Sequence, residues 1–385
     1  MPAHAGALVK GPAAEAELLA ACGFAAVPGV GAATLSRIVA AFGSFEAALH
    51  AGTSGLRSRA ADLRLRTEAS RYLEDDPDLG RLGSWALEEA RKAGARPLLL
   101  GHEGYPPLLA RSAKAPVVLY VRGTLAPKAR RVAVVGAREC DEQGLDLARA
   151  LGEDLARGKI EVVSGGARGV DAAAHAGALW GAGTTVAILG CGIDQAYPPE
   201  NRELFDRIAS GGGAVMSELV PGAMPKPANF PRRNRIIAAL SEATVVVRAG
   251  ARSGALVTAR DAVDEGRPVF AMRGPPGEAL SEGPAMLLRD GLARQVTDAA
   301  DLCVQMGWDL DVPQREPRPK ADRPRVQTDE AGERLLALLD DHTEMHVDEL
   351  AARSHLAPQE VLRKLTELEV LGLCRQRPGK YFLRC

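Results

Sequence analysis

The segment of this 385-residue sequence with the clearest chemical character is KPANFPRRNRIIAALS, residues 226–241. It places Phe230 beside three arginines, at positions Arg232, Arg233 and Arg235. Proteins that bind single-stranded nucleic acid combine cationic groups for the phosphates with aromatic faces on which bases stack. Residues 226–273 carry nine basic and four acidic side chains, although the net charge of the whole chain is −1. The segment therefore predicts a single-strand binding site, unless Phe230 is a core side chain and the arginines are solvated surface.

Glycine-containing turns form a second group of candidates, because each follows a predicted strand. These turns are Gly136-Ala137-Arg138, Ser164 to Gly169, Gly190-Cys191-Gly192 and Arg252 to Ala255. At the carboxyl ends of parallel strands, glycines allow backbone N–H groups to approach phosphate closely. Any one glycine taken alone could simply permit a tight turn. Both groups together predict a phosphate groove formed by Gly136, Arg138, Ser164, Gly165, Arg168, Gly169, Lys226, Asn229, Phe230, Arg232, Arg233, Asn234, Arg235, Ser253 and Gly254.

Catalytic and cofactor chemistry has weaker support. Asp171 and His175 are four residues apart on a predicted helix, a spacing that could serve a metal or a proton relay. No third ligand or nucleophile is evident, so we predict a structural Asp171–His175 contact near the groove floor. Ser253 and Thr258 have no evident base, and helix capping or phosphate hydrogen bonding explains them more simply. We predict no catalytic residue and no metal.

Nucleotide-binding motifs are incomplete. VAVVGAREC contains only the first glycine of GxGxxG, and Arg138 stands where a small residue would be needed. The sequence also has no GxxxxGK[ST] motif, which argues against ATP hydrolysis. We therefore predict no cofactor.

The elements that would position these residues follow an alternating pattern from about residue 131 to residue 301. Short, almost continuously apolar runs such as VAVVG and ATVVV alternate with longer Ala-rich helical stretches. This pattern is typical of a parallel sheet covered by helices on both faces. The predicted fold class is α/β, with a Rossmann-like, doubly wound parallel sheet as its core.

Flanking segments complete a predicted division of the chain. Residues 1–97 have helical periodicity, residues 98–310 form the α/β core, and residues 311–327 read as a Pro/Arg-rich linker. Residues 328–385 carry three helical patterns and a hairpin with a turn at Pro378-Gly379, which predicts a winged helix. In the first segment, Pro28 to Gly31 is either a helix-hairpin-helix turn that contacts phosphate or a plain connection.

Composition limits the cellular setting. The six cysteines lack CxxC spacing, which argues against a zinc site and a disulfide framework and fits a reducing cytoplasm. The first residues lack a signal-peptide pattern, and no apolar run is long enough to span a membrane. A cytoplasmic protein without membrane contact is expected.

The motifs in order resemble the DprA/Smf family of DNA-processing proteins. The resemblance is carried by GYPPLLARSAKAPVVLYVRG, VAVVGAR, SGGARGVDAAAHAGAL, TTVAILGCGIDQAYPPENRELFDRIASGGGAVMSE, NFPRRNRIIAALS and RSGALVTARDAVDEGRPVF. It implies a Rossmann-like core that binds single-stranded DNA, forms a homodimer and loads the RecA recombinase during natural transformation. It also implies a SAM-like N-terminal domain and a C-terminal winged helix.

Carried over by position, the family's DNA-contacting basic residues fall on Arg138 and Arg168, and its NFPxRN loop falls on Asn229 to Asn234. This sequence departs from the family pattern at Ala137, Gly166, Pro199, Arg248 and Met272-Arg273-Gly274. Pro199 removes an expected positive charge and Arg248 adds one, so details of the groove are expected to differ.

The resemblance also places a dimer contact on the C-terminal flank of the core, where Met286, Leu287 and Leu288 form an apolar strip. That strip could instead pack on the sheet. Two other functions compete with strand binding. A nucleotide phosphoribohydrolase-like enzyme would need a PGGxGTxxE signature, which AGARSGALVTARD lacks, and a winged-helix transcription regulator would have only Arg363 and Lys364 on its third helix.

Overall fold

The structure of the chain is a computed structural model that describes residues 12–126, 129–309, 329–339, 345–370, 373–377 and 379–384. The chain divides into two compact units, Met1–Pro313 and Gln314–Cys385. The predicted linker, residues 311–327, lies outside the described residues. The predicted domain boundary between residues 97 and 98 falls inside strand β1 (Ala95–Leu99). A separate N-terminal domain therefore stays a prediction.

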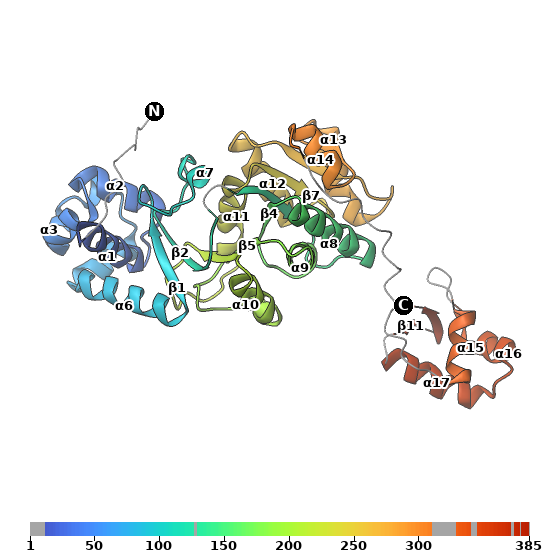
Figure 1. Ribbon diagram of the computed structural model, residues 1–385. Coiled ribbons are helices and arrows are strands. Elements are labelled where there is room, and N and C mark those ends of the chain that lie inside the picture. The colour runs from blue at the N-terminus through green and yellow to red at the C-terminus, as the bar shows by residue number, and fades with distance from the viewer. Residues whose placement is uncertain are drawn as a thin grey trace. The chain divides into compact units, whose positions relative to one another are not determined.

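A mixed sheet organises the first unit (Figure 1). Within the described residues its strand order is β1-β2-β6-β5-β4-β3-β7-β8-β9. The strands from β3 to β9 pair in parallel, whereas β1 pairs antiparallel with β2 and β2 pairs antiparallel with β6. Their bounds are β1 (Ala95–Leu99), β2 (Val118–Gly123), β3 (Arg130–Val135), β4 (Ile160–Ser164), β5 (Thr185–Ile188), β6 (Ala214–Ser217), β7 (Ala243–Val246), β8 (Val269–Met272) and β9 (Arg294–Val296).

The predicted doubly wound core is confirmed, with one difference. Strands β4 to β8 are buried along their whole length, as expected when helices cover both faces of a parallel sheet. The antiparallel edge of the sheet was not predicted from the sequence. Strands β1 and β2 precede the first crossover helix, and antiparallel strands need only a short connection.

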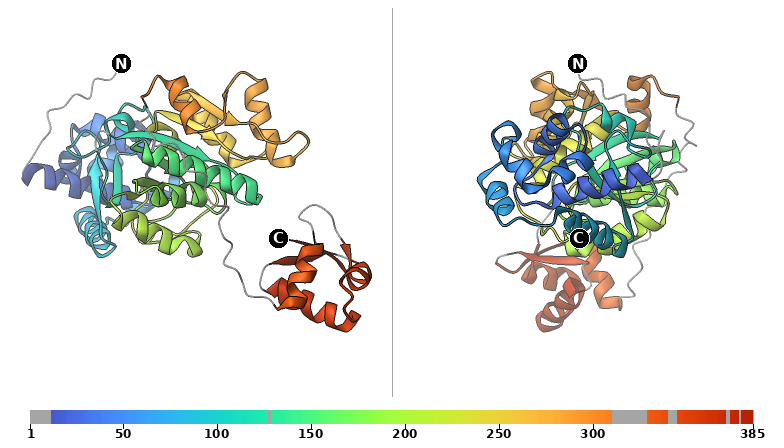
Figure 2. Two further views of the ribbon diagram at one scale, coloured as in Figure 1. Left: turned by 45° about the vertical axis from the view of Figure 1, so that its right-hand side comes forward. Right: turned by 90° about the vertical axis from the view of Figure 1, so that its left-hand side faces the viewer.

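Helices cover both faces of the sheet, because the chain changes its direction of winding at β3. Helices α8, α9 and α14 pack on one face in a shared apolar cluster, and α8 lies directly beside α9 (Figures 1 and 2). Helices α11, α12 and α13 contribute to the cluster on the opposite face. The bounds are α8 (Glu142–Arg157), α9 (Val170–Trp180), α10 (Arg202–Ser210), α11 (Asn229–Leu240), α12 (Gly254–Asp264), α13 (Glu282–Arg289) and α14 (Ala299–Met306).

The switch point of the fold lies between β3 and β7. Strand β3 pairs with β4 on one side and with β7 on the other, with Val135 opposite Val246 at the carboxyl ends. The chain winds outward from β3 in one direction through β4, β5 and β6, then crosses to β7 and continues to β9. In open α/β sheets, the crevice at such a point is where ligands bind.

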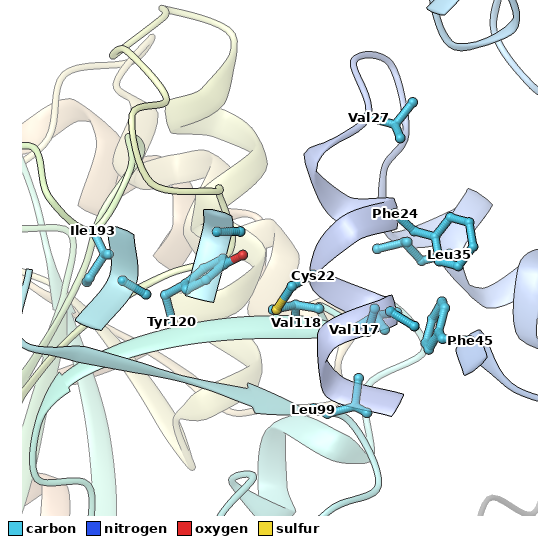
Figure 3. Close-up of a cluster of buried hydrophobic side chains, with 14 of the residues drawn as sticks. Cys22, Phe24, Val27, Leu35, Phe45, Leu99, Val117, Val118, Tyr120 and Ile193 are labelled. Atoms are coloured by element: carbon cyan, nitrogen blue, oxygen red, sulfur yellow. The ribbon is translucent and has the colours of Figure 1, made fainter. Parts of the chain in front are cut away.

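Helices of the N-terminal segment pack against the antiparallel edge of the sheet. Cys22 and Phe24 of α1 share a buried cluster with Val118 and Tyr120 of β2, as the close-up shows (Figure 3). The predicted turn between α1 and α2 contains Gly29 with φ +78°, but neither interpretation of that turn is tested by this geometry. The helices are α1 (Pro12–Ala26), α2 (Ala32–Phe42), α3 (Phe45–Ser58), α4 (Ala60–Leu63), α5 (Thr67–Glu74), α6 (Leu79–Lys92) and, between β1 and β2, α7 (Pro107–Ala110).

The second unit has the predicted winged-helix arrangement of three helices and a small sheet. Leu335, Leu350, Leu365 and Phe382 meet in its buried core. In the described part of this unit the strand order is β10-β12-β11. The elements are α15 (Glu330–Leu338), β10 (Met345–His346), α16 (Val347–Ser354), α17 (Pro358–Val370), β11 (Cys374–Arg377) and β12 (Tyr381–Arg384).

No single helix among the described residues is long and apolar enough to cross a membrane. Helices α2 and α3 taken together have the length and apolar composition of a membrane-spanning segment, but they are bent by 93° relative to each other.

Candidate nucleic-acid interface

A cavity of about 440 Å³ opens at the switch point between β3 and β7. We call it the switch-point hollow. Its walls come from the turns after β3, β4 and β7, from the long loop after β5, from α11 and from the start of α12. Its lining residues are Val135, Gly136, Arg138, Ala167, Asp171, Tyr197, Pro227, Phe230, Pro231, Arg233, Asn234, Ile237, Ser253, Gly254, Ala255 and Thr258.

Phe230 stands at the centre of an aromatic and cationic cluster in this hollow. Its ring centroid lies 5.2 Å from that of Tyr197, and the Arg138 guanidinium lies 5.3 Å from the Phe230 centroid. A Cβ added at Gly190 would come within 2.7 Å of the Phe230 ring, so the ring packs directly on that glycine. Phe230 is only half-buried. The cluster thus offers aromatic surface and a positive charge at one place.

The resemblance places a loop at Asn229 to Asn234, but in the structure this segment begins helix α11 at Asn229. Pro231 is compatible with this, because the first helical turn needs no backbone N–H donor. The helix turns its neighbouring arginines in different directions. Arg232 is exposed, whereas Arg233 is 5% exposed and points inward.

Arg233 holds the floor of the hollow together. Its Nη1 donates to the Gly165 carbonyl oxygen at 2.6 Å and also to the Ile188 carbonyl oxygen. The Ile188 carbonyl is the last of β5, and Gly165 directly follows β4. Burial lowers the pKa of Arg233 to about 10, and the Asp171 carboxylate opposes this shift. Arg233 therefore supplies a positive charge from below while it joins two strands.

Asp171 shapes the turn after β4 from the first turn of α9. Its Oδ2 accepts from the backbone N–H groups of Gly165 at 3.1 Å and Ala167 at 3.4 Å. Burial raises the pKa of Asp171, and the nearby Arg233 charge acts against this. A Cβ at Gly165 would lie 2.5 Å from Arg233 Nη2 and 2.7 Å from Asp171 Oδ2, so this position has no room for a side chain.

The predicted Asp171–His175 contact is replaced by separate partners. His175 is fully buried, and its Nδ1 lies 2.7 Å from Thr185 Oγ1. The Thr185 hydroxyl donates to the Val162 carbonyl oxygen at 2.7 Å, so it can only accept from His175. Burial lowers the pKa of His175 to about 3, with a smaller contribution from the Arg233 charge. His175 is thus a neutral structural residue beneath the hollow.

The turns after β3 and β4 are tied to each other and to β7. Ala137 N donates to the Arg248 carbonyl oxygen at 2.7 Å, and Val170 N donates to the Ala137 carbonyl oxygen at 3.1 Å. Gly169 has φ +74°, and a Cβ there would lie 2.3 Å from the Ala137 oxygen. Ser164 Oγ donates to the Val134 carbonyl oxygen at 2.6 Å and is completely buried. Ser164, Gly165 and Gly169 therefore support the hollow from behind its lining.

Arg168 lies on the exposed rim and is paired with Glu200. This hydrogen bond raises the pKa of Arg168 and lowers that of Glu200. Beside the pair, Asn201 Nδ2 donates to the carbonyl oxygens of Gly166 at 3.0 Å and Ala167 at 3.3 Å. The short 3-10 helix Pro199–Asn201 thus fixes the turn after β4 through Asn201 and pairs the Arg168 charge with Glu200.

The amino end of α12 forms the opposite wall. Ser253 caps this helix by accepting from Ala255 N at 3.3 Å, which is one of the two roles that the sequence suggested for it. Asn234 Nδ2 donates to the Gly254 carbonyl oxygen at 3.2 Å and joins α11 to α12. Helix amino ends favour anions because their N–H groups and dipole point toward the ligand.

Several predicted groove residues lie outside the lining. Lys226 is exposed, and Asn229 is half-buried. Arg235 pairs with Glu218 and does not line the hollow. Arg248, expected to add charge to the groove, is 1% exposed and contributes its backbone instead. Of the apolar strip on α13, Leu287 is 5% exposed and packs in the core below the sheet, whereas Met286 and Leu288 are half-buried.

Two lining residues with polar side chains were missed as site candidates. Tyr197 comes from the loop after β5, and its signal was an aromatic residue in the YPPEN stretch that follows a glycine turn. Thr258 lies on the second turn of α12; the sequence suggested capping or phosphate hydrogen bonding for it but did not place it in the groove. Among the described residues, no three His, Cys, Asp or Glu side chains could hold a metal ion together.

Family models match both units of the chain. The model for DNA recombination-mediator protein A matches residues 96–307, and the model for the DprA winged helix domain matches residues 319–380. The first match covers more than half of the chain and includes every residue that lines the switch-point hollow.

Known proteins are similar over most of the chain. Protein Smf of Escherichia coli is 38% identical over 285 residues, which are 72% of this chain and 75% of that protein. A putative DNA processing protein DprA of Mycobacterium tuberculosis is 37% identical over 343 residues, covering 87% of this chain and 83% of the relative.

Two solved structures share the fold. The structure of DNA processing protein A from Streptococcus pneumoniae matches with a TM-score of 0.62 at 29% identity and covers 78% of this chain and 99% of that one. The protein of the same name from Helicobacter pylori, described with a single-stranded DNA binding mode, matches with a TM-score of 0.50 at 28% identity. That match covers 55% of this chain and 95% of the other.

Proposed function

The chain belongs to the DprA/Smf family of DNA processing proteins, and we propose that it binds single-stranded DNA in the switch-point hollow. The observation that carries this proposal is the Phe230 cluster, in which an aromatic pair and the Arg138 guanidinium meet at the carboxyl ends of the strands. Bases of any sequence can stack on the aromatic faces, and phosphates can pair with the cations. The similarity to the Helicobacter pylori protein supports the same ligand.

Binding rather than catalysis is the activity that we propose. His175, the residue best suited to acid–base chemistry, is fully buried and bonded to Thr185. Ser253 is used as a helix cap. Neither arrangement supports a nucleophile with an adjacent base.

The winged helix carries little support for a separate regulatory function. Its basic residues Arg363 and Lys364 on α17 both pair with Glu367, and Lys364 also pairs with Asp329 at 2.7 Å. Base reading in a major groove would need free donors on this helix. From family membership we also propose that the bound strand is handed to RecA during natural transformation, which a RecA filament assembly assay on the coated strand would test.

Fluorescence anisotropy with single- and double-stranded oligonucleotides of equal length tests the proposal. We expect preference for the single strand and, with roughly four to six phosphates contacted, a log–log salt slope of about −3 to −4. Arg138→Ala should weaken binding roughly tenfold and flatten the slope by about 0.7, because one phosphate contact is lost. Phe230→Ala should weaken binding by a similar factor without changing the slope, because stacking releases no counterions.

The matched control is Arg207→Ala, which removes an exposed arginine on α10 outside the hollow lining. Wild-type affinity in the Arg138→Ala, Phe230→Ala double variant would place the strand elsewhere on the protein and defeat the proposal. Equal affinity for duplex DNA would also count against it.

A further inference from the structure

Arg248 follows β7 and sits beside the hollow, but its side chain points away from it. Its carbonyl oxygen accepts from Ala137 N at 2.7 Å, which ties it to the turn after β3. The side chain is 1% exposed and does not line the hollow. A guanidinium stays charged in proteins, so this charge is buried and must be balanced nearby.

Within the described residues, the partners of the Arg248 guanidinium satisfy only part of its charge and hydrogen-bonding capacity. Arg248 Nε lies 4.0 Å from Asp141 Oδ1, and Nη2 donates to Gln143 Oε1 at 3.4 Å. Both contacts are long for a buried charge. In that same part of the chain, Arg248 Nε and Nη1 have no hydrogen-bond partner, nor does the buried hydroxyl of Ser281. Unpaired buried donors are costly unless a ligand completes them.

The unpaired groups converge on Gly274, in the turn after β8. A Cβ placed on Gly274 would lie 2.2 Å from Arg248 Nη1 and 2.1 Å from Ser281 Oγ. Gly274 and Ser281 both line a cavity of about 470 Å³ that shares no lining residue with the switch-point hollow. We call it the Ser281 cavity. Arg248 lies directly behind its glycine wall.

Charged side chains along the Ser281 cavity are of both signs. Arg273 and Arg289 line it, as do Glu278 and Glu282. Arg289 also pairs with Asp290 at 3.0 Å, whereas Arg248 adds a buried positive charge behind Gly274. Guanidinium groups and hydroxyl donors are the usual ligands of phosphate oxygens. A cavity of this size also exceeds what a free phosphate ion needs and is within the range of small-molecule sites.

We propose that the Ser281 cavity binds a phosphate group carried by a larger molecule. The Ser281 hydroxyl donates to a phosphate oxygen, Arg248 supplies a buried positive charge from behind Gly274, and the exposed Arg273 attracts the ligand. The carrier is either a phosphodiester of a DNA strand or a free nucleotide, which share this chemistry. The inference does not depend on strand binding in the switch-point hollow, because the two sites have separate linings.

Inorganic phosphate, titrated at constant ionic strength with sodium chloride as the reference, tests the site through the melting temperature of the full chain. A ligand that binds only the folded state raises the melting temperature in a saturable way. We expect Ser281→Ala to weaken this response at least fivefold, because one hydrogen bond to a charged group is lost. Arg248→Gln should weaken it further, and Arg207→Ala, which removes an exposed arginine outside the lining of both cavities, should respond like wild type.

Ser281→Ala keeps the test decisive if Arg248→Gln does not fold, since it removes only a buried hydroxyl without a partner. No melting shift in wild-type protein, or an equal shift in wild type and Ser281→Ala, would overturn the proposal. Two further measurements identify the carrier. If a strand phosphate occupies the cavity, Ser281→Ala lowers single-strand affinity with little change in the salt slope, because the hydroxyl carries no charge. If the carrier is a nucleotide, thymidine monophosphate stabilises wild type at lower concentration than phosphate, and strand affinity is unchanged.

Discussion

Replacement of Arg233 by methionine should destabilise the fold rather than simply weaken strand binding. Methionine keeps much of the side-chain volume but removes the charge and both donors to the ends of β4 and β5. It also leaves Asp171 buried opposite an apolar group. Two buried carbonyls lose their donor and the Asp171 carboxylate loses the nearby positive charge, and leaving buried polar and charged groups uncompensated in this way costs about 3–5 kcal/mol. We expect a loss of that size in the free energy of unfolding.

Urea unfolding at pH 7.5 measures this loss directly, and thermal unfolding should show it as well. At about 2–4 °C per kcal/mol, a value typical of domains of 150–250 residues, the melting temperature should fall by roughly 6–20 °C. The matched control is Arg232→Met, one position earlier on α11 and exposed, which should change stability by less than about 0.5 kcal/mol. Adding Asp171→Asn to Arg233→Met should restore part of the loss, because the stranded charge is removed.

The reasoning is refuted if Arg233→Met unfolds like Arg232→Met. If that stable variant had also lost strand affinity with a flatter salt slope, Arg233 would be a direct phosphate ligand, as the sequence alone suggested. The burial of Arg233 and its hydrogen bonds to backbone carbonyls would then contribute little to the free energy of unfolding.

Three more predictions follow from other contacts. Burial lowers the pKa of His175 from its ordinary value of 6.5 to about 3 in the folded state, so the stability that its neutral form contributes is complete above pH 6.5. This stability is lost as the pH falls toward 3, by about 1.4 kcal/mol per pH unit. Urea unfolding between pH 7.5 and 5 should therefore show a shallower pH dependence in His175→Gln than in wild type, and equal slopes would contradict this. Glu200→Gln should strengthen single-strand binding a few-fold and steepen the salt slope by up to about 0.7, because Arg168 is released for a phosphate; anisotropy that shows unchanged or weaker binding would mean that the pair only holds the turn. Leu287→Glu should unfold the first unit, because it buries an unpaired charge. Leu288→Glu should stay folded and, if α13 forms the proposed dimer contact, should be a monomer in light scattering. A dimer that persists in folded Leu288→Glu would exclude this surface as the dimer contact.

Much of the fold was predictable because the relevant signals are local. Runs such as VAVVG and ATVVV lie on strands buried on both faces, so they carry no polar alternation and stand out from their Ala-rich helices. The winged helix was visible for a similar reason, in three apolar periodicities followed by a turn. The antiparallel strands β1 and β2 were harder, because pairing direction depends on which distant strand, here β6, accepts the edge.

The candidate site shows where local signals end. Four glycine turns, after β3, β4, β5 and β7, were predicted to meet. Those after β3, β4 and β7 line one hollow, because the carboxyl ends of parallel strands share one edge. The turn after β5 does not line it, and Gly190 packs against the Phe230 ring instead. The role of each arginine was not predictable. Arg232 and Arg233 are adjacent in the sequence, but successive helical residues point about 100° apart, so one is exposed and the other is buried under Phe230.

The amino-acid sequence by itself determined the order of strands and helices, the glycine turns at the strand ends and the family to which the chain belongs, because these follow from residue types close together along the chain. Only the tertiary structure decided which charges are available to a ligand. Arg138 is exposed beside Phe230, Arg168 and Arg235 are paired with Glu200 and Glu218, and Arg248 is buried behind Gly274. Their partners come from segments far along the chain, and burial and pairing depend on distances that only folding creates.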